Sequence, residues 1–149
     1  MGDKYLNMYY ETYIELLQEK TDWQTHARNA NSYIKRILEH LLKIKYNRDI
    51  YCKNHWALEI ENFREEASKS LRWNTKRQNT NAVNDVLNKI QVSYENAKNI
   101  YENDRIEDRT LPYISHILPD ECPYTLKELL EFDDLEKLLD KLPELEDFK

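Results

Sequence analysis

Cys52 and His55 are separated by two residues, which is a spacing found in metal sites. Cysteine and histidine are the usual zinc ligands in proteins, and His116 with Cys122 would complete a set of four. The second pair has no standard spacing relative to the first. The alternative is that the cysteines are small half-buried apolar side chains and the histidines ordinary polar groups. The sequence favours this alternative, so no metal or other cofactor is expected.

A cluster of cations surrounds a tryptophan between residues 69 and 77, and no acidic residue interrupts it. Its members are Lys69, Arg72, Trp73, Lys76 and Arg77. Such a cluster can bind the phosphates of a nucleic acid while the ring stacks on a base. It is also typical of a solvated helix end, where cations favour the helix C-terminus and the tryptophan packs inward. The sequence favours the helix end, because one short cluster supplies few phosphate contacts.

The scarcity of glycine excludes many enzyme classes, because the chain has a single glycine, Gly2. Phosphate-binding loops, dinucleotide fingerprints and nucleophile elbows all need glycines at fixed positions. The Glu-x-x-His pairs of di-iron bundles are missing as well. The residues three positions before the four histidines are Trp23, Ile37, Cys52 and Tyr113.

The elements that position these residues are predicted to be helices. Neither glycine nor proline occurs between residues 3 and 111, which disfavours the turns of a β-fold. Apolar residues recur at steps of three and four in four segments, which predicts an all-α antiparallel bundle. The four main helices are expected at about 3–20, 22–46, 55–73 and 82–103. Thr21 and Gln24 have the spacing of a capping box and mark the second helix start.

Short helices are predicted in the C-terminal third. One is expected between Pro112 and Pro119, and another after a capping box at Thr125 and Glu128. The bundle is expected to form a single domain over residues 1–131.

Residues 132–149 are predicted to be an acidic amphipathic tail or a last helix, capped by Asp133 or Asp134. Its apolar edge consists of Leu135, Leu138, Leu139 and Leu142. This segment either folds over one end of the bundle, which the sequence slightly favours, or places its leucines in the groove of a partner protein.

Charge is unevenly distributed along the chain. The net charge is −6, and residues 126–149 contain nine acidic residues and four lysines. The rest is nearly neutral, which disfavours general nucleic-acid affinity but permits local basic patches. Lys35, Glu39 and Lys43 are interpreted as an ion-pair ladder on a solvated helix face. The two cysteines lack a disulfide framework and no run is apolar enough to cross a membrane, so a cytoplasmic protein is expected.

The segment DECPYTLKELL at residues 120–130 resembles the C-terminal signature of a bacterial family called domain of unknown function 29. Members of that family tend to end in a Cys-Pro-Tyr-Thr-Leu segment. Weaker matches over residues 9–131 are His40–Lys43, Trp56 with Ile60 and Arg64, and Tyr94–Ala97. The resemblance implies a small all-helical bacterial protein and implies no activity.

Three hypotheses about function follow. The first is a non-enzymatic helical protein–protein interaction module, in one form an antitoxin- or immunity-like protein whose acidic surface covers a basic partner. The second is a nucleic-acid-associated protein that uses the cluster at 69–77 and the basic run from Lys35 to Lys53. The third is a metal-dependent enzyme that uses the two cysteine–histidine pairs. Another protein is the favoured partner, and no membrane partner is expected.

Overall fold

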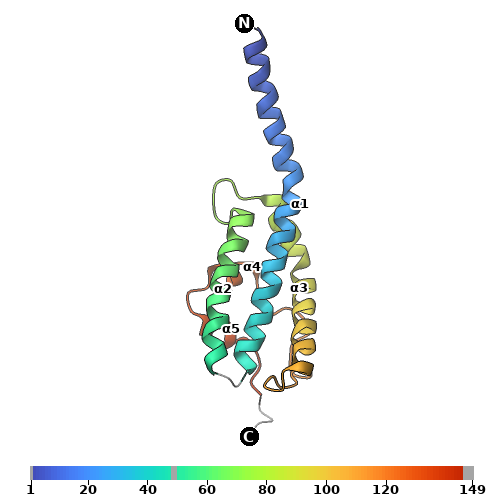
Figure 1. Ribbon diagram of the computed structural model, residues 1–149, viewed down its shortest axis with the longest axis vertical. Helices are drawn as coiled ribbons and strands as arrows, with labels where there is room; N and C mark the ends of the chain where they lie inside the picture. The colour runs from blue at the N-terminus through green and yellow to red at the C-terminus, as the bar shows by residue number, and fades with distance from the viewer. Residues whose placement is uncertain (1, 48–49, 146–149) are drawn as a thin grey trace.

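Three long helices form the body of the computed structural model, which describes residues 2–47 and 50–145, with side chains described for 22–47 and 51–145. They are α1 (Gly2–Tyr46), α2 (Ile50–Leu71) and α3 (Thr80–Glu107). α1 lies between α2 and α3 and packs on both, and α2 runs antiparallel to them (Figure 1). The described residues contain no strand, and none of their helices is long and apolar enough to span a membrane. The predicted all-α antiparallel bundle is confirmed.

The first part of the chain differs from the prediction. The helices expected at 3–20 and 22–46 are one continuous helix, so the bundle has three long helices and not four. A capping box stabilises a helix start only where the preceding backbone leaves the helix. No glycine or proline near Thr21 breaks the chain of backbone hydrogen bonds. α2 also begins at Ile50 rather than at 55, and α3 extends to Glu107 rather than to 103.

α2 ends in a Schellman motif in which an arginine occupies the position that glycine usually takes. The amide of Arg72 donates to the carbonyl of Lys69 at 3.2 Å, and the amide of Trp73 donates to that of Ser68 at 3.0 Å. Arg72 has a φ of 50°, in the left-handed region. That conformation costs a residue with a Cβ atom about 1–2 kcal/mol. The end of α2 is therefore strained at Arg72.

Replacing Arg72 by glycine is expected to raise the free energy of unfolding by about 1 kcal/mol, because glycine adopts positive φ without a Cβ clash. Urea denaturation followed by circular dichroism measures the change. Lys69→Gly is the control, because Lys69 lies inside α2, where glycine is expected to cost about 0.5–1 kcal/mol. A less stable Arg72→Gly protein would contradict the assignment of strain to this residue.

The C-terminal third packs along the bundle through turns and two short helices. α4 (Leu126–Glu131) begins at the predicted capping box, where the amide of Glu128 donates to Thr125 Oγ1 at 3.1 Å. α5 (Leu135–Leu139) is capped by Asp134, one of the two predicted residues. The helix predicted between Pro112 and Pro119 is wrong, because residues 115–117 form only a turn there.

Three buried tyrosines hold this segment against the bundle, since each hydroxyl donates to the carbonyl of a proline. The pairs are Tyr101 with Pro112 at 2.8 Å, Tyr94 with Pro119 at 2.6 Å, and Tyr46 with Pro143 at 2.7 Å. Burial raises the pKa of all three hydroxyls, so they remain protonated donors. These bonds tie both ends of residues 112–119 to α3 and so favour an irregular path over the predicted helix.

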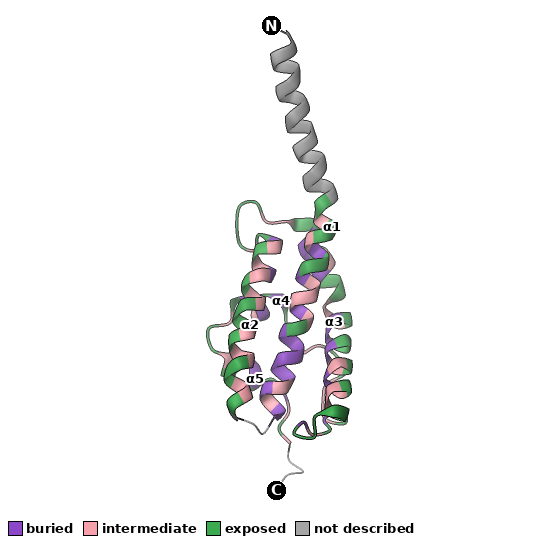
Figure 2. Ribbon diagram, in the orientation of Figure 1, coloured by how far each residue is buried: buried purple, intermediate pink, exposed green. Residues whose placement is uncertain are grey.

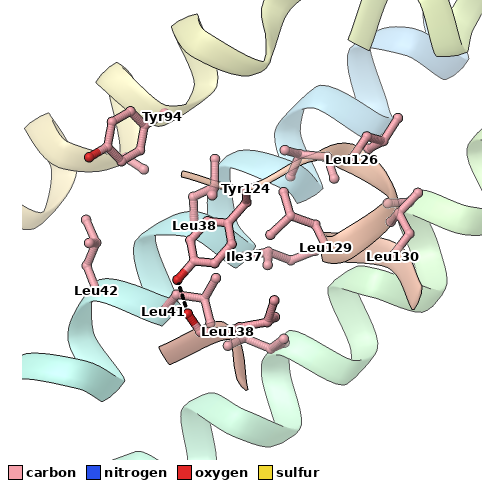
Figure 3. Close-up of a cluster of buried hydrophobic side chains, with 14 of the residues drawn as sticks. Ile37, Leu38, Leu41, Leu42, Tyr94, Tyr124, Leu126, Leu129, Leu130 and Leu138 are labelled. Atoms are coloured by element: carbon pink, nitrogen blue, oxygen red, sulfur yellow. Dashed lines mark hydrogen bonds between the residues drawn. The ribbon is translucent and has the colours of Figure 1, made fainter. Parts of the chain in front are cut away.

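The core lies where α1 meets the C-terminal segment. Leu38 and Leu41 of α1 are buried together with Tyr124 and Leu129 (Figure 3). The Tyr124 hydroxyl donates to the backbone carbonyl of Leu138, which joins α5 to the turn before α4. Figure 2 shows that the buried residues of α1 continue along the part of the helix that lies between α2 and α3.

The leucines of the predicted tail belong to this core. Leu138, Leu139 and Leu142 are buried, and Leu135 packs half-buried against them. The last helix therefore packs on the bundle. The alternative in which these leucines lie in a partner's groove is wrong for this fold, because the chain buries them against its own helices.

Candidate functional site

All five residues of the predicted cation cluster line one open hollow at the end of α2, which we call the loop hollow. Its volume is about 660 Å³. The cluster residues are Lys69, Arg72, Trp73, Lys76 and Arg77, and Glu65, Ser68 and Thr75 complete the wall. The hollow combines side chains from the last turns of α2 with those of the loop that leads to α3.

Hydrogen bonds fix the shape of this loop. Thr75 Oγ1 donates to the carbonyl of Arg72 at 2.7 Å, and the amide of Asn74 donates to Gln78 Oε1 at 3.0 Å. The side-chain amide of Asn74 also donates to Glu131 of α4. Asn74 has a φ of 60°, so the loop contains a second left-handed residue. The backbone conformation therefore positions the cationic side chains.

The loop hollow is cationic with an apolar floor. Arg72, Lys76 and Arg77 are exposed, and Lys69 Nζ lies 3.5 Å from a carboxylate oxygen of α2. Trp73 is half-buried against the hydrophobic core. The tryptophan packs inward and the cations lie at the surface of a helix end, which is the arrangement that the helix-end interpretation describes.

The structure does not gather the four candidate metal ligands, Cys52, His55, His116 and Cys122. Both cysteines are half-buried free thiols. Cys122 Sγ donates to a backbone carbonyl at 3.5 Å, and burial raises the pKa of its thiol. His55 Nε2 lies 2.8 Å from Glu59 Oε1, and the ring of His116 stacks on Tyr113. No group of three or more His, Cys, Asp or Glu side chains in the described part of the chain can hold a metal ion.

A network of charged side chains crosses the bundle, where the sequence predicted a solvated ladder. Glu39 and His40 of α1 are only 7% and 8% exposed. Lys43 Nζ lies 2.7 Å from Glu39 Oε1 and 2.7 Å from Asp104 Oδ2 of α3. His40 Nε2 contacts Glu59 of α2, and its Nδ1 lies 3.5 Å from Glu39 Oε2. The predicted ion pair between Glu39 and Lys43 is confirmed, but the prediction of a solvated face is wrong there, since both side chains are largely buried and Lys43 also pairs with α3.

Opposing effects determine the pKa values in this network. Burial lowers the pKa of His40, but the carboxylates of Glu39 and Glu59 outweigh it and the net pKa is raised. Burial raises the pKa of Glu39, but His40 and Lys43 outweigh it and the net pKa is lowered. The network therefore favours the charged form of both residues.

A second hollow, of about 560 Å³, lies between α1 and α3 and was not predicted. Trp23, Arg28 and Lys35 of α1 line it together with Asp85 and Lys89 of α3. No local motif marks these residues, because they come from segments far apart in the sequence and only packing brings them together. The one hint of this hollow in the sequence is that Trp23 and Lys35 fall in the same predicted helix.

The segment Cys122–Leu126 has structural contacts. The amide of Cys122 donates to Gln91 Oε1 at 2.7 Å, and Gln91 Nε2 donates to the carbonyl of Asp120 at 2.8 Å. Thr125 caps α4. These contacts attach the turn before α4 to α3.

Comparison with known proteins agrees with the resemblance found in the sequence. The family model described as domain of unknown function DUF29 matches residues 10–143. Neither a curated protein nor a solved structure matches the chain. The family description names no activity, so the functional argument depends on the geometry of this chain.

Proposed function

Since this chain belongs to the DUF29 family, we propose a function from its own surface, namely that it binds single-stranded nucleic acid through the loop hollow. The observation that supports this most is that all five residues of the predicted cluster line one hollow. The cations contact successive phosphates and release counterions, while a base that leaves its stack contacts the apolar floor.

The shape of the surface favours a single strand over a duplex. Trp73 is part of the lining of this open hollow, and only an unstacked base can enter such a surface and contact an aromatic ring. Reading a duplex instead requires a helix or strand that projects into a groove. The loop hollow is formed by the end of a helix and an irregular loop.

The local charge supports the proposal despite the net charge of −6. Residues 67–84 contain four cations and no acidic residue. Interactions between exposed charges are largely screened beyond about 8–10 Å at physiological salt. The field that a bound phosphate experiences therefore depends mainly on the lining of the hollow, which has four cations and one carboxylate, that of Glu65.

Backbone strain at Arg72 gives a separate argument. The left-handed position at the end of α2 is one that glycine would occupy at lower cost. Strained positions of this kind concentrate at functional sites, where the side chain has a role outside stability. Here the strained residue places a guanidinium group in the loop hollow.

A labelled single strand of about 12 nucleotides, titrated in a fluorescence anisotropy experiment, tests the proposal. We expect micromolar, salt-dependent binding, and about tenfold weaker binding for Lys76→Gln/Arg77→Gln. The plot of log affinity against log salt concentration is expected to become less steep by about 1.4 in this variant. Each phosphate contact to a single strand that is lost lowers the steepness of the slope by about 0.7.

Lys127→Gln/Lys137→Gln is the matched control, because it removes two exposed cations from α4 and α5. Its affinity for the strand is expected to remain near that of the unmodified protein. Equal losses in the two variants, or equal affinity for a duplex of the same sequence, would refute the proposed site.

A helical protein–protein interaction module of the antitoxin or immunity type is the second candidate. Tyr51 and Leu58 are 89% and 68% exposed and lie two turns apart on α2. Apolar residues with this spacing form one face that a partner helix can cover. Recovery of a stoichiometric protein partner that Leu58→Glu no longer binds would favour this candidate.

A further inference from the structure

The hollow between α1 and α3, which we call the α1–α3 groove, is a separate surface from the loop hollow. Its volume of about 560 Å³ is typical of small-molecule sites, which range over about 300–1,000 Å³. Its residues are shared by the two helices and do not include those of the cation cluster. A ligand here would contact both helices at once.

The groove offers an apolar contact surface. Trp23 is half-buried, Ala27 is buried, and Val92 is 56% exposed although it is aliphatic. An indole ring favours planar aromatic partners, because their faces stack with little loss of conformational freedom. This wall suits a planar heterocycle.

Polar groups lie beside this wall. Asn31 Nδ2 donates to Asp85 Oδ2 at 3.0 Å, and Lys89 Nζ lies 3.2 Å from the same oxygen. Both contacts hold the carboxylate of Asp85 at the polar edge of the groove, beside the apolar wall.

The charge of the groove favours an anion. Its lining contains Arg28, Lys35 and Lys89 against the single carboxylate of Asp85. Lys89 is paired with Asp85, so Arg28 and Lys35 provide the charge that the carboxylate does not neutralise. Hydrogen bonds from such cations to phosphate are about twice as strong as those between neutral groups.

We propose that the α1–α3 groove binds a nucleoside monophosphate, with the base on Trp23 and the phosphate at Arg28 and Lys35. The proposal is independent of the loop hollow, since the two surfaces share no residue. Tight binding at the α1–α3 groove requires a base and a phosphate in the same molecule, so a nucleoside or phosphate alone binds less tightly.

Isothermal titration calorimetry with adenosine 5′-monophosphate, adenosine and inorganic phosphate tests this site. We expect saturable binding of the monophosphate, at least about tenfold tighter than that of adenosine or phosphate. Arg28→Gln/Lys35→Gln is expected to weaken the monophosphate about tenfold or more without changing the affinity for adenosine. Trp23→Leu is expected to weaken both the monophosphate and adenosine, because stacking on one aromatic ring contributes about tenfold.

Lys127→Gln/Lys137→Gln is the matched charge control, and circular dichroism shows whether each variant is folded. No binding of the monophosphate at millimolar concentration would overturn the proposal. Equal affinity for phosphate alone would overturn it too, because the base would then contribute nothing. Loss of binding in Lys76→Gln/Arg77→Gln would place the nucleotide in the loop hollow and so refute the groove.

Discussion

Replacing Tyr124 by alanine is expected to lower the free energy of unfolding by about 3–5 kcal/mol, which is typical for a large aromatic residue removed from a core. Tyr124 is 4% exposed and lies among leucines of α1, α4 and α5 (Figure 3). Its hydroxyl donates to the carbonyl of Leu138. The substitution therefore leaves a cavity and removes the bond that joins α5 to the turn before α4. Chemical denaturation measures the change.

Two further variants separate these contributions. Tyr124→Phe keeps the ring and is expected to cost about 1–2 kcal/mol, because the carbonyl of Leu138 loses its donor. Tyr51→Ala is the control, because Tyr51 is 89% exposed and its removal is expected to change stability by less than about 1 kcal/mol. If Tyr124→Ala were no more destabilising than Tyr51→Ala, the C-terminal third would not form part of the core.

Replacing Glu39 by glutamine is expected to lower the free energy of unfolding by about 2–3 kcal/mol near pH 6, because nearly buried Lys43 and His40 lose a charged partner. Glu39 has a lowered pKa in the fold, so its contribution is present above its unfolded value of 4.5 and is lost as pH falls. His40 has a raised pKa, so its contribution is present below its unfolded value of 6.5 and is lost as pH rises.

The network is therefore most stabilising between pH 4.5 and 6.5. Denaturation at pH values of about 3, 6 and 9 is expected to give the largest difference between the unmodified protein and Glu39→Gln at the middle value. Glu65→Gln, at an exposed position of α2, is expected to change stability by less than about 0.5 kcal/mol. A difference that stays constant across these pH values would mean that shape, and not charge, makes Glu39 important.

The fold could be predicted where a local signal and the global packing agree. The apolar positions of 22–46 repeat at helical spacing, and Ala30, Ile34 and Leu41 are buried as that spacing predicts. The boundary at Thr21 could not be predicted, because a capping box is compatible with both a helix start and a helix interior. Only the continuous backbone of α1 distinguishes the two.

The candidate sites also differ in how far the sequence could predict them. The residues of the loop hollow are neighbours in sequence, so their proximity follows from the chain itself. The left-handed conformation of Arg72 could not be predicted, because this position usually carries glycine. The α1–α3 groove and the network around Glu39 depend on the register between helices, which no pattern within one helix determines. The less favoured metal-site alternative illustrates the converse, since suitable residue types occur in the sequence without the packing that would bring them together.

The hydroxyl-to-proline bonds have a consequence for biosynthesis. The donors lie on α1 and α3, whereas the acceptors lie between residues 112 and 143, which are synthesised after both helices. Until then, the leucines of α1 that meet α4 and α5 have no cover, and exposed apolar surface of this kind promotes aggregation. A message truncated shortly after the codon for Glu107 would therefore yield an insoluble product that quality-control proteases remove.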